Sequence, residues 1–145
     1  MSDGHAIAMA LRATYLAMHR QADAQLAQSG VTADQFVLLT AMAEGEAMTQ
    51  QELVRRTSSD PNTLRAMLVL LEKRDLVIRE AHPTDRRARR VSLTSQGKRV
   101  YKELWTQIEP FRTQMETILQ PEESRLLMGF LNRIANTIAI KPEQS

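Results

Sequence analysis

The chain has 145 residues and a mass of 16.4 kDa, which fits one domain that buries roughly two-thirds of its unfolded surface. Apolar residues make up 43% of it and charged residues 25%, as in ordinary soluble globular proteins. Cysteine is absent, which excludes disulfides, thiolate–metal sites and thiol redox sensing and fits a reducing, cytoplasmic location. We expect neither a membrane span, which needs about 18 consecutive apolar residues, nor a secretory signal, which needs a basic region before an apolar core.

The net charge of +2 conceals an uneven distribution along the chain. Residues 49–102 carry 13 Lys and Arg against 6 Asp and Glu, a net charge of +7, while the other 91 residues carry 6 against 11. A basic middle segment between acidic flanks indicates a site for a polyanion such as nucleic acid. A solvated basic face without a partner is the alternative, and charge alone does not decide between the two.

Apolar spacing predicts two helices ahead of the basic segment. Between Ile7 and Leu26 apolar side chains recur at helical intervals, and Gly30 marks the end of this first helix. The segment 32–35 fits a capping box, in which a Thr hydroxyl and a Gln side chain satisfy free N–H groups at a helix start. The second helix then extends to about Gly45.

Two shorter helices are predicted inside the basic segment. The segment from Thr49 to Glu52 fits a second capping box and opens a helix to about Thr57. Asp60 can cap the next helix, whose first position suits Pro61 because no amide donor is required there. One side of this helix carries Leu64, Met67, Leu68 and Leu71, and the other carries Asn62, Ala66, Val69 and Lys73, with Thr63 and Arg65 at the flanks.

After Asp75 the pattern changes to short strands. The segments 76–80 and 91–93 are short and β-branched and predict two strands. The segment 82–90 between them is rich in Arg and in turn-forming residues, so we expect a polar hairpin loop.

A long helical pattern starts at Thr94 and is interrupted by Pro110. Proline removes a backbone donor from the helix interior, so we expect a kink or break near Glu109. The segment 120–123 starts a final helix, with a proline and two acidic residues placed favourably in its first turn.

The order of these elements is typical of a winged helix-turn-helix domain: helix, turn, helix, strand, arginine loop and strand. The second of these helices can enter the major groove of B-DNA, which is about 12 Å wide. There Asn62 and Arg65 can reach base edges, and Thr63 can reach a phosphate or a base. A short hairpin that carries Arg fits a narrow minor groove, where the negative potential is strongest. The N–H groups at the start of the preceding helix, near Thr49 and Gln50, can hold a phosphate.

Two segments resemble signatures of the MarR-type transcriptional regulators. The segment from Asp85 to Thr94 resembles the wing signature of that family: Asp, any residue, Arg, five further residues and Leu-Thr. The segment from Leu71 to Val77 resembles the end of the family's recognition helix, where Gly is commoner than the Asp75 of this chain. Asp adopts left-handed backbone geometry less readily than Gly, but does adopt it. The resemblance covers essentially the whole chain, and the wing signature is its more specific part.

The resemblance implies a mainly α fold with a small β-hairpin wing and a homodimer on double-stranded DNA. One MarR-type domain would span residues 1–145, with a winged helix-turn-helix core at about 32–94 and dimerisation helices at about 5–28 and 95–140. Two cores related by a two-fold axis suit a pseudo-palindromic operator. Packing within the monomer is the alternative for the apolar stripes of the terminal helices. By the same resemblance we expect a repressor without a cofactor that responds to a small aromatic or lipophilic effector.

The resemblance also assigns roles to individual residues. Asn62, Thr63 and Arg65 match the positions that contact the major groove. Arg87 matches the wing arginine that enters the minor groove, and Asp85 matches the acid that orients it. The complete set of predicted DNA-binding residues is Thr49, Gln50, Asn62, Thr63, Arg65, Asp85, Arg86, Arg87 and Arg89.

The remaining arginines of the basic segment have weaker assignments. Arg86 and Arg89 are candidate phosphate partners. Ordinary solvation in the loop is the alternative for both, and also for Arg90. Arg55 and Arg56 can pair with acids on neighbouring helices instead of contacting DNA.

The sequence contains no motif typical of a catalytic site or a metal site. The three histidines share no metal-ligand spacing, no glycine-rich phosphate loop occurs, and no motif groups Ser, His and Asp for nucleophilic catalysis, so we expect no enzyme. The absence of Cys excludes the thiol peroxide sensors of the resembled family. A helical module that binds an acidic protein partner is the rival function. Residues that could line an effector cavity, or simply pack in the core or at an interface, are Tyr15, His19, Phe36 and Trp105.

Overall fold

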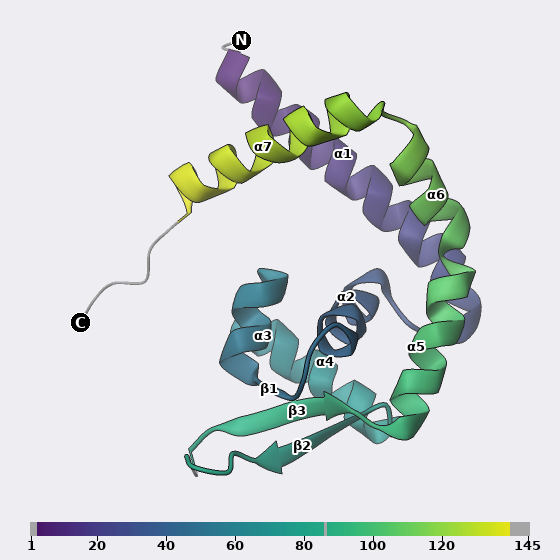
Figure 1. Cartoon of the computed structure of the whole chain (residues 1–145), viewed down its shortest axis with the longest axis vertical. Helices are drawn as coiled ribbons and strands as arrows, with labels where there is room; N and C mark the ends of the chain where they lie inside the picture. The colour runs from purple at the N-terminus through teal and green to yellow at the C-terminus, as the bar shows by residue number, and fades with distance from the viewer. Residues whose placement is uncertain (1–2, 86, 140–145) are drawn as a thin grey trace. The chain divides into compact units, whose positions relative to one another are not determined.

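A computed structural model describes residues 3–85 and 87–139 of the chain. It divides into two compact units, residues 1–109 and 110–145. The predicted fold class is confirmed, because helices dominate and a small antiparallel sheet carries the hairpin. None of the helices in the described ranges combines the length and apolar character that a membrane span requires. Figure 1 shows α1 (Asp3–Leu26), the 3-10 turn η1 (Ala27–Ser29), α2 (Ala33–Ala43), β1 (Met48–Thr49), α3 (Gln50–Thr57), α4 (Pro61–Lys73), β2 (Val77–Ala81), β3 (Arg89–Leu93), α5 (Ser95–Gln107), α6 (Glu109–Thr117) and α7 (Pro121–Ile138).

Capping side chains start two helices of the first unit where the sequence predicts. The Oγ1 of Thr32 accepts the Gln35 N–H at 3.1 Å, and the Gln35 side chain accepts the Thr32 N–H at 3.1 Å, so the first capping box is complete. The Asp60 carboxylate accepts the Thr63 N–H at 3.0 Å, and Pro61 occupies the first turn of α4. A cap of this kind stabilises a helix by about 1 kcal/mol.

The second predicted capping box is only half formed. The Oγ1 of Thr49 accepts the Glu52 N–H at 3.1 Å, but the Glu52 carboxylate accepts the Thr49 hydroxyl rather than the Thr49 backbone N–H. The backbone of Thr49 lies in β1, opposite Arg90 of β3. The prediction is wrong in this half because strand pairing fixes the Thr49 backbone, a constraint that local spacing does not contain.

The sheet has three antiparallel strands in the order β1-β3-β2. The sequence does not predict β1, since two residues give no alternation to recognise. The predicted hairpin loop is too long: β2 extends to Ala81, and β3 begins at Arg89, directly opposite it. Arg89 and Arg90 therefore belong to a strand, because cross-strand pairing continues through polar residues beyond the apolar pattern.

Helices α2, α3 and α4 cover one face of this sheet (Figure 1), and apolar side chains fill the space between them. Burial of one Leu or Val side chain stabilises the fold by roughly 1.5–3 kcal/mol, so this core holds the winged segment together. The large, fully buried side chains of the segment are Leu38, Leu39, Leu53, Leu64, Leu68, Leu71, Leu76, Val77 and Val91.

A tight turn joins α4 to β2 and fixes where the wing begins. Asp75 has a φ of +59°, as the expected left-handed turn requires, and the Leu76 N–H donates to the Leu71 carbonyl at 3.0 Å. The start of α5 packs against this turn, where the Thr94 hydroxyl donates to the Asp75 carbonyl. A Cβ at Gly97 would lie 2.0 Å from the Leu76 carbonyl oxygen. Glycine is required at this position because no side chain fits.

The long C-terminal pattern breaks where Pro110 predicts it. Helix α5 ends at Gln107 and α6 begins at Glu109, which places Pro110 in a first turn, where its missing N–H leaves no bond unmade. In the second unit, Gln120 caps the start of α7, and its N–H is accepted by the Glu123 carboxylate at 2.8 Å. Within α7 no side chain is buried.

Candidate nucleic-acid interface

The first turn of α4 presents three predicted contact residues to solvent. Asn62, Thr63 and Arg65 are all exposed. The Asp60 cap fixes this turn, because its carboxylate accepts both the N–H of Thr63 at 3.0 Å and the Thr63 hydroxyl at 3.2 Å. While the hydroxyl donates to Asp60, it offers a ligand only acceptor lone pairs, which suit a base amino group and not a phosphate.

The start of α3 holds Thr49 and Gln50, both half-buried. The Thr49 hydroxyl is engaged with Glu52, whose N–H it accepts and to whose carboxylate it donates at 3.2 Å. The helix dipole and free N–H groups favour an anion here, but the Glu52 carboxylate brings a negative charge to the same turn. This acid sets α3 apart from the first turn of α4, whose residues after the cap include no acid.

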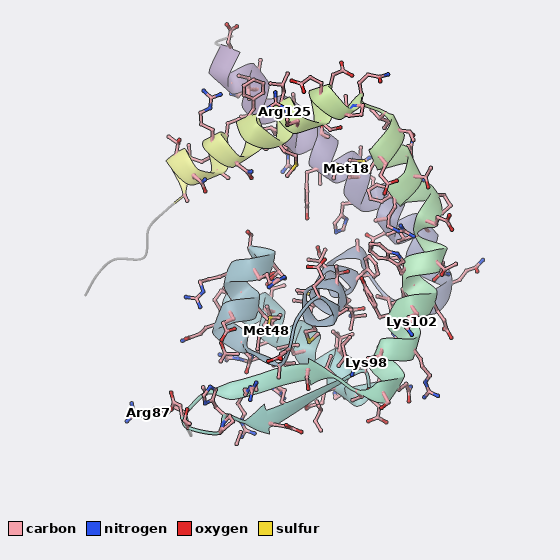
Figure 2. All side chains as sticks on the ribbon, in the orientation of Figure 1. Met18, Met48, Arg87, Lys98, Lys102 and Arg125 are labelled. Atoms are coloured by element: carbon pink, nitrogen blue, oxygen red, sulfur yellow. The ribbon has the colours of Figure 1, made fainter. Side chains whose placement is uncertain are left out.

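The wing loop is tied together by side-chain and backbone hydrogen bonds. Asp85 Oδ1 accepts the Arg87 backbone N–H at 3.0 Å, and the Asp85 carbonyl accepts the Ala88 N–H at 3.2 Å. The Nδ1 of His82 accepts the N–H groups of Thr84 and Asp85, each at 3.2 Å. Figure 2 places Arg87 at the tip of the β2–β3 hairpin, where its side chain is exposed. Asp85 thus orders the backbone from which Arg87 projects.

The other wing arginines differ in surroundings. Arg86 lies outside the described residues. Arg89 is exposed on β3, as a phosphate partner must be. Arg90 is half-buried, and its Nη2 donates to the Ala47 carbonyl at 3.4 Å. Arg90 therefore links β3 to the chain ahead of β1 and is not a purely solvated loop residue.

Two further arginines of the basic segment pair with acids. Arg56 Nη2 lies 3.3 Å from Glu44 Oε2, which confirms the predicted pairing of Arg56 with a neighbouring helix. Arg79 of β2 donates to Glu72 of α4 through Nε at 3.0 Å and Nη2 at 3.2 Å. The Arg79 hydrogen bonds hold the pKa of Glu72 below its ordinary value, and the same bonds raise the pKa of Arg79. No pattern in the sequence indicates a role for Glu72 or Arg79, which lie seven positions apart in different elements.

Aromatic side chains gather between α2 and α5. The ring of Phe36 stacks on Tyr101 with centroids 5.8 Å apart, and on Trp105 at 6.4 Å. Phe36 is at the edge of the core with 9% of its surface exposed, whereas Trp105 keeps 41%. The structure thus joins two of the predicted effector residues. It adds Tyr101, which its four-residue helical spacing from Trp105 could have indicated.

The other two predicted effector residues form a separate group. Tyr15 and His19 of α1 have ring centroids 5.7 Å apart. The Nδ1 of His19 lies 3.2 Å from Asp23, and its Nε2 lies 3.4 Å from Asp34 of α2. The contact with Asp34 links α1 to α2, whereas the contact with Asp23 lies within α1. Among the described residues, no cluster of His, Asp and Glu has an arrangement that suits a metal ion.

Known proteins share this architecture and parts of this sequence. The model of the MarR family matches residues 29–88, which include the helix-turn-helix and the wing loop. YdgJ of Bacillus subtilis, an uncharacterized HTH-type transcriptional regulator, is 30% identical over 110 residues, 76% of this chain and 67% of that protein. MepR of Staphylococcus aureus in complex with DNA superimposes with a TM-score of 0.82 at 20% identity, covering 90% of this chain and 97% of that one. BpsR of Bordetella bronchiseptica, solved to explain regulation of its DNA binding by 6-hydroxynicotinic acid, gives a TM-score of 0.79 at 26% identity, covering 89% of this chain and 98% of that one.

Proposed function

This chain belongs to the MarR family of winged helix-turn-helix transcriptional regulators, and we propose that it acts as a homodimeric repressor. The members of this family bind DNA and are not enzymes. The dimer binds a pseudo-palindromic operator through two winged segments, one for each half-site. A small aromatic or lipophilic molecule releases the DNA.

The observation that carries this proposal is the pairing of an exposed helix start with an exposed arginine at a hairpin tip in one compact unit. Asn62, Thr63 and Arg65 stand on the first turn of α4, which suits base edges in the major groove. Arg87 projects from the wing, which suits the narrow minor groove. Arg89, exposed on β3, is a phosphate partner in this arrangement. Arg86, which lies outside the described residues, stays a phosphate partner on the strength of its place in the sequence alone. Thr49 and Gln50 at the start of α3 add a weaker phosphate contact, because Glu52 opposes it.

Exposed apolar side chains on two long helices support a homodimer. Helix α1 is 24 residues long and buries only Ala22 and Leu26, while α7 is 18 residues long and buries none of its side chains. Soluble monomers rarely leave large contiguous apolar faces in water, and a two-fold partner covers the same face on both copies. The large apolar residues that these two helices expose are Ile7, Met9, Leu11, Tyr15, Leu126, Leu127, Met128, Phe130 and Ile138.

The aromatic stack supports a flat effector. Phe36, Tyr101 and Trp105 offer ring faces on which a flat ligand can stack, and Trp105 keeps 41% of its surface exposed. BpsR, whose DNA binding is regulated by an aromatic acid, has the same fold. The ligand must bind the DNA-competent and DNA-incompetent states unequally, since only that difference can shift the equilibrium.

The experiment that tests the function is selection of bound fragments from the source genome, followed by titration of the recovered duplex. We expect Kd to rise steeply with salt, because Arg–phosphate contacts release counterions. Arg87→Ala weakens binding by about 1–3 kcal/mol. Arg125→Ala, on α7 and outside the basic segment, leaves binding unchanged. Equal, weak binding to every duplex, or equal behaviour of the two variants, contradicts the proposal.

The rival function, an interaction module for an acidic protein partner, shares the charge requirement. Charge reversal in the wing would harm both functions and does not separate them. Nuclease protection does separate them: a regulator shields a duplex of operator length, and an interaction module shields none.

A further inference from the structure

A forked ion pair joins the recognition helix to the wing. Glu72 lies in the last turn of α4, and Arg79 lies in the middle of β2. Arg79 Nε donates to Glu72 Oε2 at 3.0 Å, and Arg79 Nη2 donates to Glu72 Oε1 at 3.2 Å. Two parallel bonds between a guanidinium and a carboxylate fix orientation as well as distance. The pair therefore restrains the direction in which β2 leaves the helix.

The pair stands where the wing leaves the core. Arg79 alternates with Val77 along β2 and is paired with Val91 of β3, so it shares a sheet face with these two buried residues. The Arg79 side chain is 25% exposed and the Glu72 side chain 40%. On β2, Val77 is buried, and Arg79, the next residue on the same face, is held to α4 by the ion pair with Glu72.

Glu72 is ionised at neutral pH, so the ion pair with Arg79 is formed there. The bond from Arg79 holds the pKa of Glu72 below its usual range, and the positive charge of Arg89 acts in the same direction. Glu72 is thus a carboxylate at neutral pH, with two cations of the wing near it.

We propose that Glu72 and Arg79 are positioning residues that hold the wing at the angle at which Arg87 and the start of α4 reach their two grooves together. This inference rests on the proposed function, because it presumes that both elements contact one duplex. Neither residue needs to touch DNA itself. The pair restricts the orientations of the wing in the free protein. Binding to DNA therefore costs less conformational entropy.

A positioning role and simple electrostatics predict opposite changes in the operator affinity of Glu72→Gln. Glu72→Gln removes a negative charge beside a DNA-binding surface, which by Coulomb attraction alone should tighten binding to any duplex. A positioning role predicts that the same variant binds the operator about 2- to 5-fold more weakly, the range that a partly exposed ion pair supports. Arg79→Gln weakens operator binding in both views, so Glu72→Gln is the informative change.

The test measures operator affinity of the full-length protein by fluorescence anisotropy, with the duplex recovered by fragment selection. We expect Glu72→Gln and Arg79→Gln each to lose about 2- to 5-fold in affinity. The charge-swapped double variant Glu72→Arg with Arg79→Glu should recover to within about 2-fold of the unchanged protein, because the pair re-forms with net charge conserved. Glu122→Gln is the matched control, since Glu122 makes the same fork with Arg125 on α7 and should have no effect.

A second measurement reports coupling between the pair and the wing tip. Arg87→Ala should cost less affinity in the Glu72→Gln background than in the unchanged protein, because a misdirected wing already contributes less. Wild-type or tighter operator binding by Glu72→Gln overturns the inference, as does an unaltered effect of Arg87→Ala in that background. If Arg87→Ala is itself without effect, or the unchanged protein prefers no duplex, the proposed function fails and the inference fails with it.

Discussion

The winged segment and helix α7 use similar apolar periodicity with different outcomes. In the winged segment, α4 buries Leu64, Leu68 and Leu71 against neighbouring helices and strands of its own chain. In α7, Leu127 and Phe130 keep 43% and 48% of their surface exposed. The first segment completes its core within one chain. The second leaves its apolar stripe exposed. An apolar stripe thus predicts a face suited to burial, but it does not identify the surface that covers that face.

The largest expected effect comes from the core side of this comparison. Leu68 is 0% exposed, so Leu68→Ala removes buried methyl groups and leaves a cavity, which destabilises the fold by about 2–5 kcal/mol. Leu70, in the same helix but 51% exposed, is the matched control, and Leu70→Ala should stay within about 0.5 kcal/mol. Urea denaturation of both variants measures the difference. Similar losses in the two variants would contradict the assigned core.

The next effect tests the uncovered stripe of α7. Phe130→Asp places a charge in the proposed dimer surface and should weaken self-association by on the order of 2 kcal/mol, as for a buried aromatic anchor. Sedimentation measures the change as a shift from dimer to monomer. Asn132→Asp, on the same helix, adds the same charge at a polar position. A monomer–dimer distribution that is the same for Phe130→Asp and the unchanged protein would show that the stripe is covered in another way.

The cap of α4 gives an intermediate effect. Asp60→Ala removes the acceptor of the Thr63 N–H and should destabilise the winged segment by about 1 kcal/mol. Asp60→Asn is the control, because Asn caps a helix nearly as well without the charge. Thermal denaturation distinguishes the two. An Asn variant as destabilised as the Ala variant would mean that charge, and not the hydrogen bond, matters at this position.

The smallest effect is the pH dependence of the Glu72–Arg79 pair. Because the folded protein lowers the pKa of Glu72 below the ordinary 4.5, the unfolded chain takes up this proton first as the pH falls. The pair therefore contributes its full stability above about 4.5 and loses it as the pH drops through the lower folded value. The free energies of unfolding of the unchanged protein and of Glu72→Gln should differ most at neutral pH and converge in acid. A difference that is constant down to pH 3 would contradict the cause assigned to this shift.

Local signals in the sequence predict most of the winged fold. The Thr32 and Asp60 caps and the break beside Pro110 are each fixed by a few neighbouring residues, and the structure confirms them. The wing signature places Asp85 and Arg87 in the same loop, where the carboxylate orders the Arg87 backbone. The DNA-binding roles of these residues stay predictions, to be tested on the operator.

Interactions between distant segments were decided by tertiary structure. Strand β1 exists because β3 pairs with it, and that pairing also takes the Thr49 backbone out of its predicted capping box. The Glu72–Arg79 fork depends on the angle between a helix and a strand, which no periodicity encodes. The sequence alone determined where helices start and stop and where positive charge gathers, because those depend on near neighbours. Which arginines turn inward and which project outward depended on packing, because burial is a property of the assembled chain.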